Sequence, residues 1–294
     1  MVDAGTSSRS HTFGIKPVTV REGAALQHLL RLRFLSARQL AEFVFDGSGV
    51  SSRSQLVMTW RLIAALRRQG LVAITLRMIG GPGAGSDRPA YYLTATGQRL
   101  ARSVSPGARR ARLKSPGTVL VRHALATADV LLAFRRSARS QADHELVAWE
   151  CDWQAAMALG SSLVVPDAYL LYRVAEQRLH AFVEIDLGTE HTRFVAEKMR
   201  QYLELQRAGS WRARFPVWPL VLIVAETDAR VVQLRRVSEA VVSREGGGLG
   251  SAASSFRFAR LAEVTDERGP LQRIWQVIGG VEPVPLAPPP AHVS

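Results

Sequence analysis

The chain has 294 residues, of which 47% are hydrophobic and 21% charged, a globular composition that is long enough for two ordinary domains. Its longest apolar run, Trp218–Ala225, is far shorter than a membrane span, and residues 1–16 lack the apolar stretch of a signal peptide. The one cysteine, Cys151, excludes an internal disulfide, no Cys/His cluster suggests zinc, and we expect a cytoplasmic protein without a membrane partner.

The net charge of +13 resides entirely in the N-terminal part of the chain. Residues 1–117 contain 18 Lys and Arg against 5 Asp and Glu, whereas residues 118–294 contain 20 of each. A concentrated positive field attracts polyanions such as nucleic acids. Arginine outnumbers lysine 35 to 3, as a codon bias would produce, but such a bias does not explain why the rest of the chain is neutral.

Helical spacing of apolar residues organises the first part of the chain. Residues 1–20 lack a strong period and are expected to form a flexible arm. Beyond them the pattern predicts three helices: Glu22–Phe34, Ala37–Phe45 and Arg53–Gln69. Ser36 is a candidate N-cap of the second helix, and Gly70 ends the third. The third helix is expected to bury four side chains: Leu56, Trp60, Ile63 and Leu66.

A hairpin is predicted after the third helix. Leu71–Ile79 alternates like a strand, Ala90–Thr94 reads as its partner, and the Gly- and Pro-rich Gly80–Pro89 forms the loop between them. The string RRQGLV…YYLTATGQRLA, within Arg67–Ala101, resembles the end of the recognition helix, the wing and the next helix of MarR-like winged-helix proteins. This resemblance predicts an N-terminal winged helix-turn-helix domain over residues 21–102.

In winged-helix domains the third helix enters the major groove of double-stranded DNA and reads base edges with its N-terminal residues. The residues at those positions are Ser52, Arg53, Gln55 and Thr59. Arg88, in the wing, would touch phosphate or enter the minor groove. The linker 103–117 includes Arg109 and Arg110, which would either add phosphate contacts or belong to a solvated hinge. The alternative is a module that contacts only proteins.

The pattern changes after residue 117, where alternating helices and strands predict an α/β domain over residues 118–265. The predicted helices are Val119–Arg139, Glu190–Arg207 and Asp228–Val242. The predicted strands are Leu146–Cys151, Leu163–Val174, Leu179–Leu187, Val217–Glu226 and Phe256–Leu261, with Ala155–Ser162 as a short helix or a loop. We therefore expect an α+β protein whose second domain has a mixed sheet, followed by a disordered Pro-rich tail over residues 279–294.

Acidic residues occupy unusual positions in this second domain. Asp167 opens one predicted strand, and Glu184 and Asp186 lie on one face of the next, because successive residues of a strand alternate between faces. Clustered carboxylates need a cation or a proton, and hard oxygen ligands suit Mg²⁺. Lys198 lies off the solvated face of its helix, so it could point at these carboxylates, or it could snorkel at the rim of an apolar stripe.

The segments VPDAYLLY (Val165–Tyr172) and FVEIDLGTE (Phe182–Glu190), together with Lys198 and Tyr202, resemble the replication-relaxation family of plasmids and integrative mobile elements. The resemblance implies a winged helix followed by a domain similar to the PD-(D/E)XK nuclease fold. It assigns Asp167 and Glu184 as metal ligands and places Asp186 where the nuclease motif has lysine. Three interpretations are open. Asp186 could take the place of that lysine, or Lys198 on the next helix could perform the role of the lysine. Alternatively, the domain is a degenerate nuclease fold that serves as a binding scaffold.

Two functions follow from this pattern. The first is a DNA-binding factor for replication initiation or DNA relaxation, together with other replication or transfer proteins. If it is active, it would be a Mg²⁺-dependent DNA endonuclease or nickase that uses Asp167, Glu184, Asp186 and Lys198. The alternative is a non-enzymatic transcriptional regulator whose second domain forms a homodimer or binds a partner. Trp211, Trp218 and Trp275 could serve such an interface, although core packing is the commoner use of tryptophan. A tyrosine relaxase is disfavoured, because the sequence lacks a histidine triad.

Overall fold

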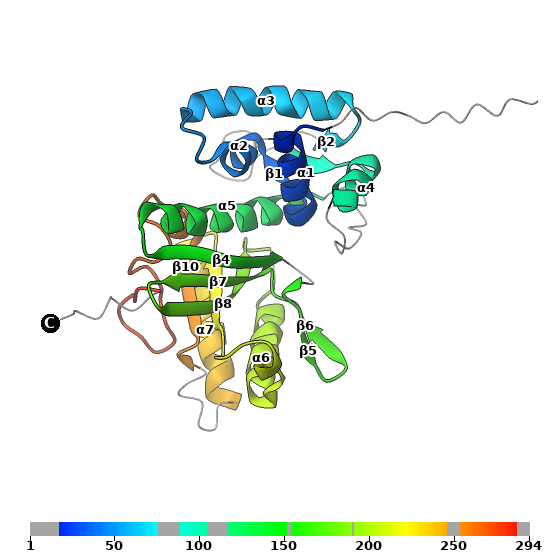
Figure 1. Cartoon of the computed structure of the whole chain (residues 1–294). Helices are drawn as coiled ribbons and strands as arrows, with labels where there is room; N and C mark the ends of the chain where they lie inside the picture. The colour runs from blue at the N-terminus through cyan, green and yellow to red at the C-terminus, as the bar shows by residue number, and fades with distance from the viewer. Residues whose placement is uncertain are drawn as a thin grey trace, which may run out of the picture.

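The computed structural model describes residues 18–75, 89–104, 117–151, 154–189, 191–245 and 253–286. These residues form an N-terminal module, residues 18–104, that lies on a larger C-terminal domain, residues 117–286 (Figure 1). Within these ranges no helix has the length and apolarity that crossing a membrane requires. The long helix α5 separates the module from the sheet of the C-terminal domain.

Helices surround a small antiparallel sheet in the N-terminal module. In chain order its elements are α1 (Val20–Leu32), β1 (Leu35–Ser36), α2 (Ala37–Phe45), α3 (Ser52–Arg68), β2 (Val72–Ile74), β3 (Ala90–Leu93) and α4 (Ala95–Val104). Strand β3 lies between β1 and β2 and is antiparallel to both. Three helices followed by a strand pair is the order that the sequence predicts. Residues 76–88, which hold most of the predicted loop, lie outside the described residues.

Local capping determines where the first two helices begin. The Thr19 hydroxyl accepts a hydrogen bond from the Glu22 N–H at 3.3 Å, and the Glu22 carboxylate accepts one from the Thr19 N–H at 2.7 Å. Ser36 and Gln39 form the same reciprocal pair at the start of α2. Such pairs satisfy N–H groups that the first turn of a helix leaves unpaired. Helix α2 accordingly has the bounds that the sequence predicts.

The rotation of α3 about its axis differs from the sequence-based expectation. Ile63 and Leu66 are buried as part of the module's core, and Thr59 is fully buried beside them. Trp60, in contrast, is 53% exposed, and Leu56 is only partly buried. The prediction that Trp60 lies in the core is therefore wrong, because the packed face of the helix passes through Thr59, Ile63 and Leu66 instead.

The C-terminal domain is built on a five-stranded mixed sheet. Its elements are α5 (Thr118–Ser140), β4 (His144–Cys151), β5 (Met157–Leu159), β6 (Ser162–Val164), β7 (Ala168–Val174), β8 (Gln177–Asp186), α6 (Thr192–Ala208), the 3-10 turn η2 (Ser210–Ala213), β9 (Leu220–Ala225), α7 (Asp228–Glu245), β10 (Phe256–Arg260) and α9 (Leu261–Val264). The strand order is β10-β9-β8-β7-β4, with β4, β7 and β8 antiparallel and β8, β9 and β10 parallel. The α+β class and the mixed sheet predicted from the sequence are confirmed.

Helices cover both faces of this sheet, α5 on one side and α6 with α7 on the other (Figure 1). Val183 and Ile185 of β8 belong to the core layer that contains Phe134 of α5, whereas Phe182 packs with Tyr202 of α6. This alternation agrees with the period of two in the sequence. Glu184 and Asp186 share the parity of Phe182, so they lie on the side of α6 and α7.

Two segments of the C-terminal domain differ from the sequence-based prediction. Strands β5 and β6 form an antiparallel hairpin where the sequence predicts a short helix or a loop. The single strand predicted over Leu163–Val174 is divided into β6 and β7, with Pro166 between them. Proline cannot donate a ladder hydrogen bond, which explains the break.

Part of the tail that composition predicts to be disordered, within residues 279–286, makes ordered contacts with the rest of the domain. Trp275 and Val284 exchange backbone hydrogen bonds of 3.1 and 2.8 Å, and Leu286 is only 5% exposed. Trp275 is fully buried, and its indole N–H donates to the Pro270 carbonyl oxygen at 2.7 Å. It therefore serves the core rather than an interface, and Trp211 also packs in the core. Residues 287–294 lie outside the described residues.

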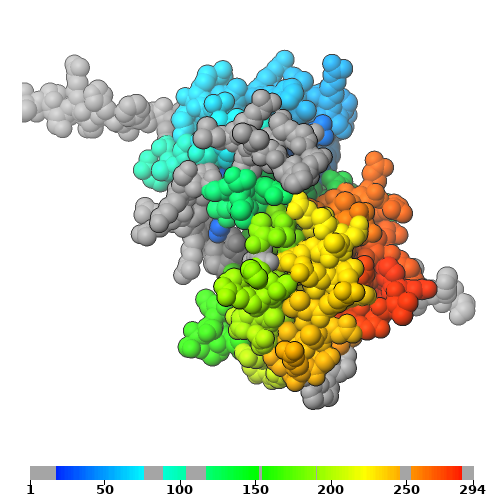
Figure 2. Space-filling model, turned by 180° about the vertical axis from the view of Figure 1, so that it is seen from behind, coloured from blue at the N-terminus to red at the C-terminus, as the bar shows by residue number. Residues whose placement is uncertain are grey.

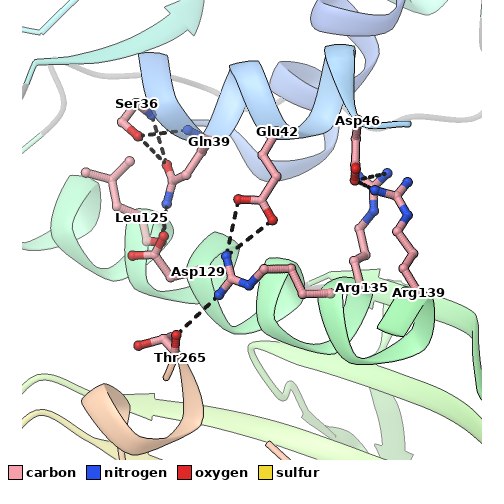
Figure 3. Close-up of polar contacts among 10 residues, drawn as sticks. Ser36, Gln39, Glu42, Asp46, Leu125, Asp129, Arg135, Arg139 and Thr265 are labelled. Carbon is pink, nitrogen blue, oxygen red and sulfur yellow. Dashed lines mark hydrogen bonds and ion pairs between the residues drawn. The ribbon is translucent and has the colours of Figure 1, made fainter. Parts of the chain in front are cut away.

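A polar contact connects the two parts of the molecule. Gln39 of α2 donates through Nε2 to the Leu125 carbonyl oxygen at 2.8 Å and to Asp129 Oδ1 at 2.6 Å, both on α5 (Figure 3). Its Oε1 accepts from the Ser36 N–H at 2.9 Å, so one side chain both caps α2 and attaches it to α5. This contact fixes the module against the C-terminal domain with α3 on the side away from α5 (Figure 1).

Candidate functional site

The outer face of α3 carries exposed cationic and apolar side chains, which we call the α3 stripe: Arg53, Val57, Trp60, Arg61, Ala64, Arg67 and Arg68. Their spacings of three and four residues place them on one helical face. The helix contains no acidic residue. Among the described elements, α1, α2 and β2 pack against its other side, and α3 forms the outer boundary of the module in Figures 1 and 2.

The residues predicted to contact DNA differ in their exposure and hydrogen bonding in the structure. Ser52 and Arg53 are exposed at the start of α3. Gln55 donates from Nε2 to the Val50 carbonyl oxygen at 2.9 Å. The role predicted for Thr59 is wrong, because its hydroxyl is buried and donates to the Gln55 carbonyl oxygen at 2.8 Å. Three further predicted contact residues lie outside the described residues: Arg88, Arg109 and Arg110.

Sequence reasoning missed the middle and the end of the α3 stripe. Arg61, Arg67 and Arg68 were detectable, because they follow Arg53 at helical spacing in a segment free of acidic residues. Trp60 was not, since a large apolar side chain on a helix is ordinarily assigned to the core. Only the packing of α3 against α1 and α2 shows that Trp60 lies among the exposed arginines.

Two acidic side chains of the module, Glu42 and Asp46, point toward the C-terminal domain. Residues 18–75 and 89–104 contain ten arginines and three acidic residues. Arg136 Nη1 lies 3.2 Å from both carboxylate oxygens of Glu42, and Asp46 contacts Arg139 and lies 3.7 Å from Arg135 (Figure 3). Because these carboxylates face α5, they do not neutralise the arginines of the α3 stripe.

A second site lies inside the C-terminal domain, around Glu184. Glu184 is 5% exposed, and two side chains from α6 donate to its carboxylate, the Lys198 ammonium to Oε2 and the Tyr202 hydroxyl to Oε1. Burial raises the pKa of Glu184 to about 7, although the Lys198 charge opposes this change. Burial and the neighbouring Glu184 charge also raise the pKa of Tyr202 well above its usual value. Lys198 thus points at a carboxylate, as the sequence allowed.

Asp167 lies beside this group and contacts α5. Its Oδ2 is 3.1 Å from His123 Nε2 and accepts a hydrogen bond from the Ile185 N–H at 2.8 Å. Burial opposes ionisation of Asp167, but the hydrogen bond with His123 and the Lys198 charge lower its pKa overall. Burial likewise opposes protonation of His123, yet its contacts with Asp167 raise its pKa above the ordinary value. The pair therefore behaves as a partly buried ion pair.

The structure does not bring Asp186 into this group. Asp186 Oδ1 accepts from Arg230 Nε at 2.8 Å and from the Gly188 N–H at 2.7 Å, while Oδ2 accepts from Arg230 Nη2 at 2.7 Å. Arg230 comes from α7, 44 residues along the chain, and both side chains are nearly buried. The expectation that Asp186 shares one site with Asp167 and Glu184 is therefore corrected, because the guanidinium holds this carboxylate.

A family model described as Replication-relaxation matches residues 26–221. The chain belongs to the replication-relaxation family. The matched segment begins in α1 and ends in β9, so this member of the family is matched across both the α3 stripe and the Glu184 group. No curated protein and no solved structure matches the chain significantly.

The carboxylates of this replication-relaxation protein do not fit Mg²⁺ in the arrangement described. Mg²⁺ requires several oxygen ligands at about 2.0–2.1 Å, but the Glu184 carboxylate contacts an ammonium and a phenol, and Asp186 contacts a guanidinium. Among the described residues no three His, Cys, Asp or Glu side chains gather into a group that could hold a metal. A divalent ion beside Glu184 would also be repelled by Lys198.

Glu184→Gln should flatten the pH dependence of stability. Because the folded-state pKa of about 7 lies above the ordinary value of 4.5, the native state binds this proton more tightly, and the wild type loses stability as the pH rises through that window. Between pH 5 and pH 8 we expect the wild type to lose roughly 2–3 kcal/mol relative to the variant, at about 1.4 kcal/mol per unit. Urea unfolding at four pH values measures this difference, and parallel pH profiles for the two proteins would contradict it.

Proposed function

We propose that this protein binds double-stranded DNA through α3 and acts in replication initiation or DNA relaxation of a plasmid or an integrative mobile element, in the cytoplasm. The observation that carries the proposal is the α3 stripe, an exposed helical face with four arginines, one exposed tryptophan and no acidic residue. Membership in the replication-relaxation family supports the biological role.

The dimensions of α3 suit the major groove. Its 17 residues span about 25 Å at 1.5 Å per residue, and the groove, about 12 Å wide, admits an α-helix. In this arrangement Arg53 at the N-terminal end reaches base edges, and Trp60 makes apolar contact in the groove. Arg61, Arg67 and Arg68 neutralise phosphates on either side, which fixes the helix in register.

The order of the elements supports assignment of the module as a winged helix. Three helices are followed by β2 and β3, and the third helix lies on the outside, away from α5. The recognition helix of a winged-helix domain occupies such a position, since it must enter the groove without hindrance from the rest of the protein.

The C-terminal domain, which we take to be related to the PD-(D/E)XK nuclease fold, serves in this proposal as a non-hydrolytic scaffold. Lys198 pairs with Glu184, which the nuclease motif assigns to the metal, and Arg230 pairs with Asp186, which stands at the lysine position of that motif. This pairing favours the scaffold over the Mg²⁺-dependent endonuclease. The domain holds the module through α5 and offers the remaining surface to partner proteins or to a second copy.

Replacing Arg61, Arg67 and Arg68 together with alanine should weaken binding to a labelled 30-bp duplex at least tenfold at low salt. It should also reduce the slope of log Kd against log salt concentration by about two to three, because each lost phosphate contact releases roughly one counterion fewer. Fluorescence anisotropy between 50 and 300 mM salt measures both quantities. The matched control replaces three exposed arginines of the C-terminal domain: Arg178, Arg212 and Arg236.

If both triple variants bind equally, or if the control loses as much affinity, α3 is not the DNA-binding helix. The same samples also test the scaffold assignment. With Mg²⁺ or Mn²⁺ the wild type should leave supercoiled plasmid intact. Divalent-dependent nicking that Asp167→Ala and Glu184→Ala abolish would overturn that assignment in favour of the endonuclease.

A further inference from the structure

A groove of about 530 Å³ runs along the edge of the central sheet, between β4, α5 and the N-terminal module. Its floor is formed by residues 144–149 of β4, and its walls come from α5 and from α1 and α2. It is separate from the α3 stripe and from the Glu184 group, since it shares no lining residue with either.

The outer edge of β4 lies in this groove. In the strand order β4 is terminal, and among the described strands only β7 pairs with it. Successive side chains of a strand point to opposite faces, so a groove that touches six consecutive residues follows the backbone edge rather than one face. The register shifts between Leu146 and Ala148, and Val147 between them is 46% exposed. Such an edge presents unpaired N–H and C=O groups.

The side chains around this edge favour a negatively charged occupant. Three arginines line the groove, Arg31, Arg135 and Arg139, against one carboxylate, Glu145, whose Oε2 already accepts two hydrogen bonds from Arg173. Asp46 lies close to Arg135 and Arg139 outside the lining, and Asp143 precedes the strand. Burial, with the charges of Arg135 and Arg31, lowers the pKa of His28 to about 4, so this lining residue adds no charge near neutral pH.

One residue that lines the groove has an unsatisfied buried donor. Trp149 lines it, is 4% exposed, and its indole N–H has no hydrogen-bond partner among the described residues. Buried donors without a partner carry a free-energy penalty of about 1–3 kcal/mol. Phe43, stacked on His28 at 4.6 Å between ring centroids, supplies an apolar wall on the opposite side.

We propose that the groove binds an extended acidic segment of a partner protein, which adds as a strand to the outer edge of β4. The backbone of the segment would pair with β4, and acidic side chains on one of its faces would reach Arg31, Arg135 and Arg139, a recognition mode known as β-augmentation. A second copy of this chain fits less well, because pairing two β4 edges would bring two sets of these arginines together. A duplex would not exploit the strand edge.

The test uses a capped, fluorescein-labelled ten-residue peptide in which glutamate alternates with threonine. We expect saturable binding to the full chain, and at least fivefold weaker binding by Arg31→Glu. Arg236→Glu, an equally exposed reversal on α7, should bind like the wild type. A peptide with N-methyl groups at alternate residues keeps the charge but cannot complete the ladder, so it should bind at least tenfold more weakly. Hydrogen exchange should slow at residues 144–149 when the peptide is bound.

Several results would overturn the proposal. Equal binding of the N-methylated peptide would show attraction by charge alone, and unchanged exchange at residues 144–149 would place the peptide elsewhere. Competition by duplex DNA that disappears in the Arg61, Arg67 and Arg68 triple variant would assign the peptide to the α3 stripe. If the protein forms a concentration-dependent dimer without peptide, and hydrogen exchange at residues 144–149 is slow in that dimer, the outer edge of β4 binds a second copy of the chain instead. If the protein binds the peptide but does not bind DNA, the proposed role of α3 is wrong and the proposal for the groove stands.

Discussion

Arg230→Ala should lower the free energy of unfolding by about 3–5 kcal/mol, the range expected when one partner of a buried ion pair is removed. The guanidinium of Arg230 donates twice to Asp186, at 2.8 and 2.7 Å, and the two side chains are only 11% and 9% exposed. Without Arg230, Asp186 keeps the Gly188 N–H as a donor, but a buried charge loses its counterion. The carboxylate must then bind a proton or recruit water, and either response weakens the junction between β8 and α7.

Two further variants test whether the loss of stability comes from the buried ion pair. The double variant Arg230→Met with Asp186→Asn removes both charges and should recover more than half of the loss, because no unpaired charge remains. Arg173→Ala breaks an exposed pair with Glu145, at 39% and 52% exposure, and should change stability by less than about 1 kcal/mol. Urea unfolding monitored by circular dichroism compares all four proteins. An Arg230→Ala loss no larger than that of Arg173→Ala would show that Asp186 is not a buried partner.

Gly97→Ala should destabilise the N-terminal module by about 3 kcal/mol, at the upper end of what overpacking causes. A β-carbon at Gly97 would lie 2.0 Å from the carbonyl oxygen of Leu71. That oxygen cannot retreat freely, because it accepts a hydrogen bond from the Thr94 N–H at 3.0 Å. The Thr94 hydroxyl in turn accepts from the Gly97 N–H at 3.1 Å, which holds the start of α4 against the entry to β2.

Gly23→Ala is the matched control for this substitution. Gly23 also lies inside a helix, but a β-carbon there meets no atom within 4 Å. Alanine favours the helix by about 1 kcal/mol relative to glycine, so this variant should be neutral or slightly more stable. Urea unfolding and the rate of proteolysis of the module measure both variants. If Gly97→Ala is as stable as Gly23→Ala, the close approach of α4 to Leu71 does not exist in the protein.

The stability of the α2–α5 contact bears on the proposed function. Glu42 of α2 and Asp46 directly after it meet arginines of α5 (Figure 3). The arginines of α3 are exposed on the outer face of the module. The contact therefore places Glu42 and Asp46 against the C-terminal domain, whereas the guanidinium groups of the α3 stripe lie at the surface. In the proposed function, a module held in this way would present the arginines of α3 to DNA without competition from Glu42 and Asp46.

Much of this architecture could be predicted from the sequence, because it depends on local chemistry. Ser36 and Gln39 determine the start of α2 through side chains three residues apart, and the period of two in β8 separates Val183 from Glu184. The LT..G pattern, Leu93 with Thr94 and Gly97, pointed to the junction of strand and helix at the start of α4. Membership in the replication-relaxation family could be recognised from Asp167, Glu184 and Lys198 with their neighbours, because the match depends on residue types and their spacing along the sequence.

Other features depended on contacts between residues far apart in the sequence. Whether Thr59 or Trp60 is buried depends on a rotation of α3 by a fraction of a turn, which the facing surfaces of α1 and α2 select. Asp186 is paired with Arg230 only because parallel pairing of β8 with β9 brings the start of α7 beside the end of β8. A sequence period identifies the face on which a side chain lies, but the partner it meets there is determined by the packing of the other elements.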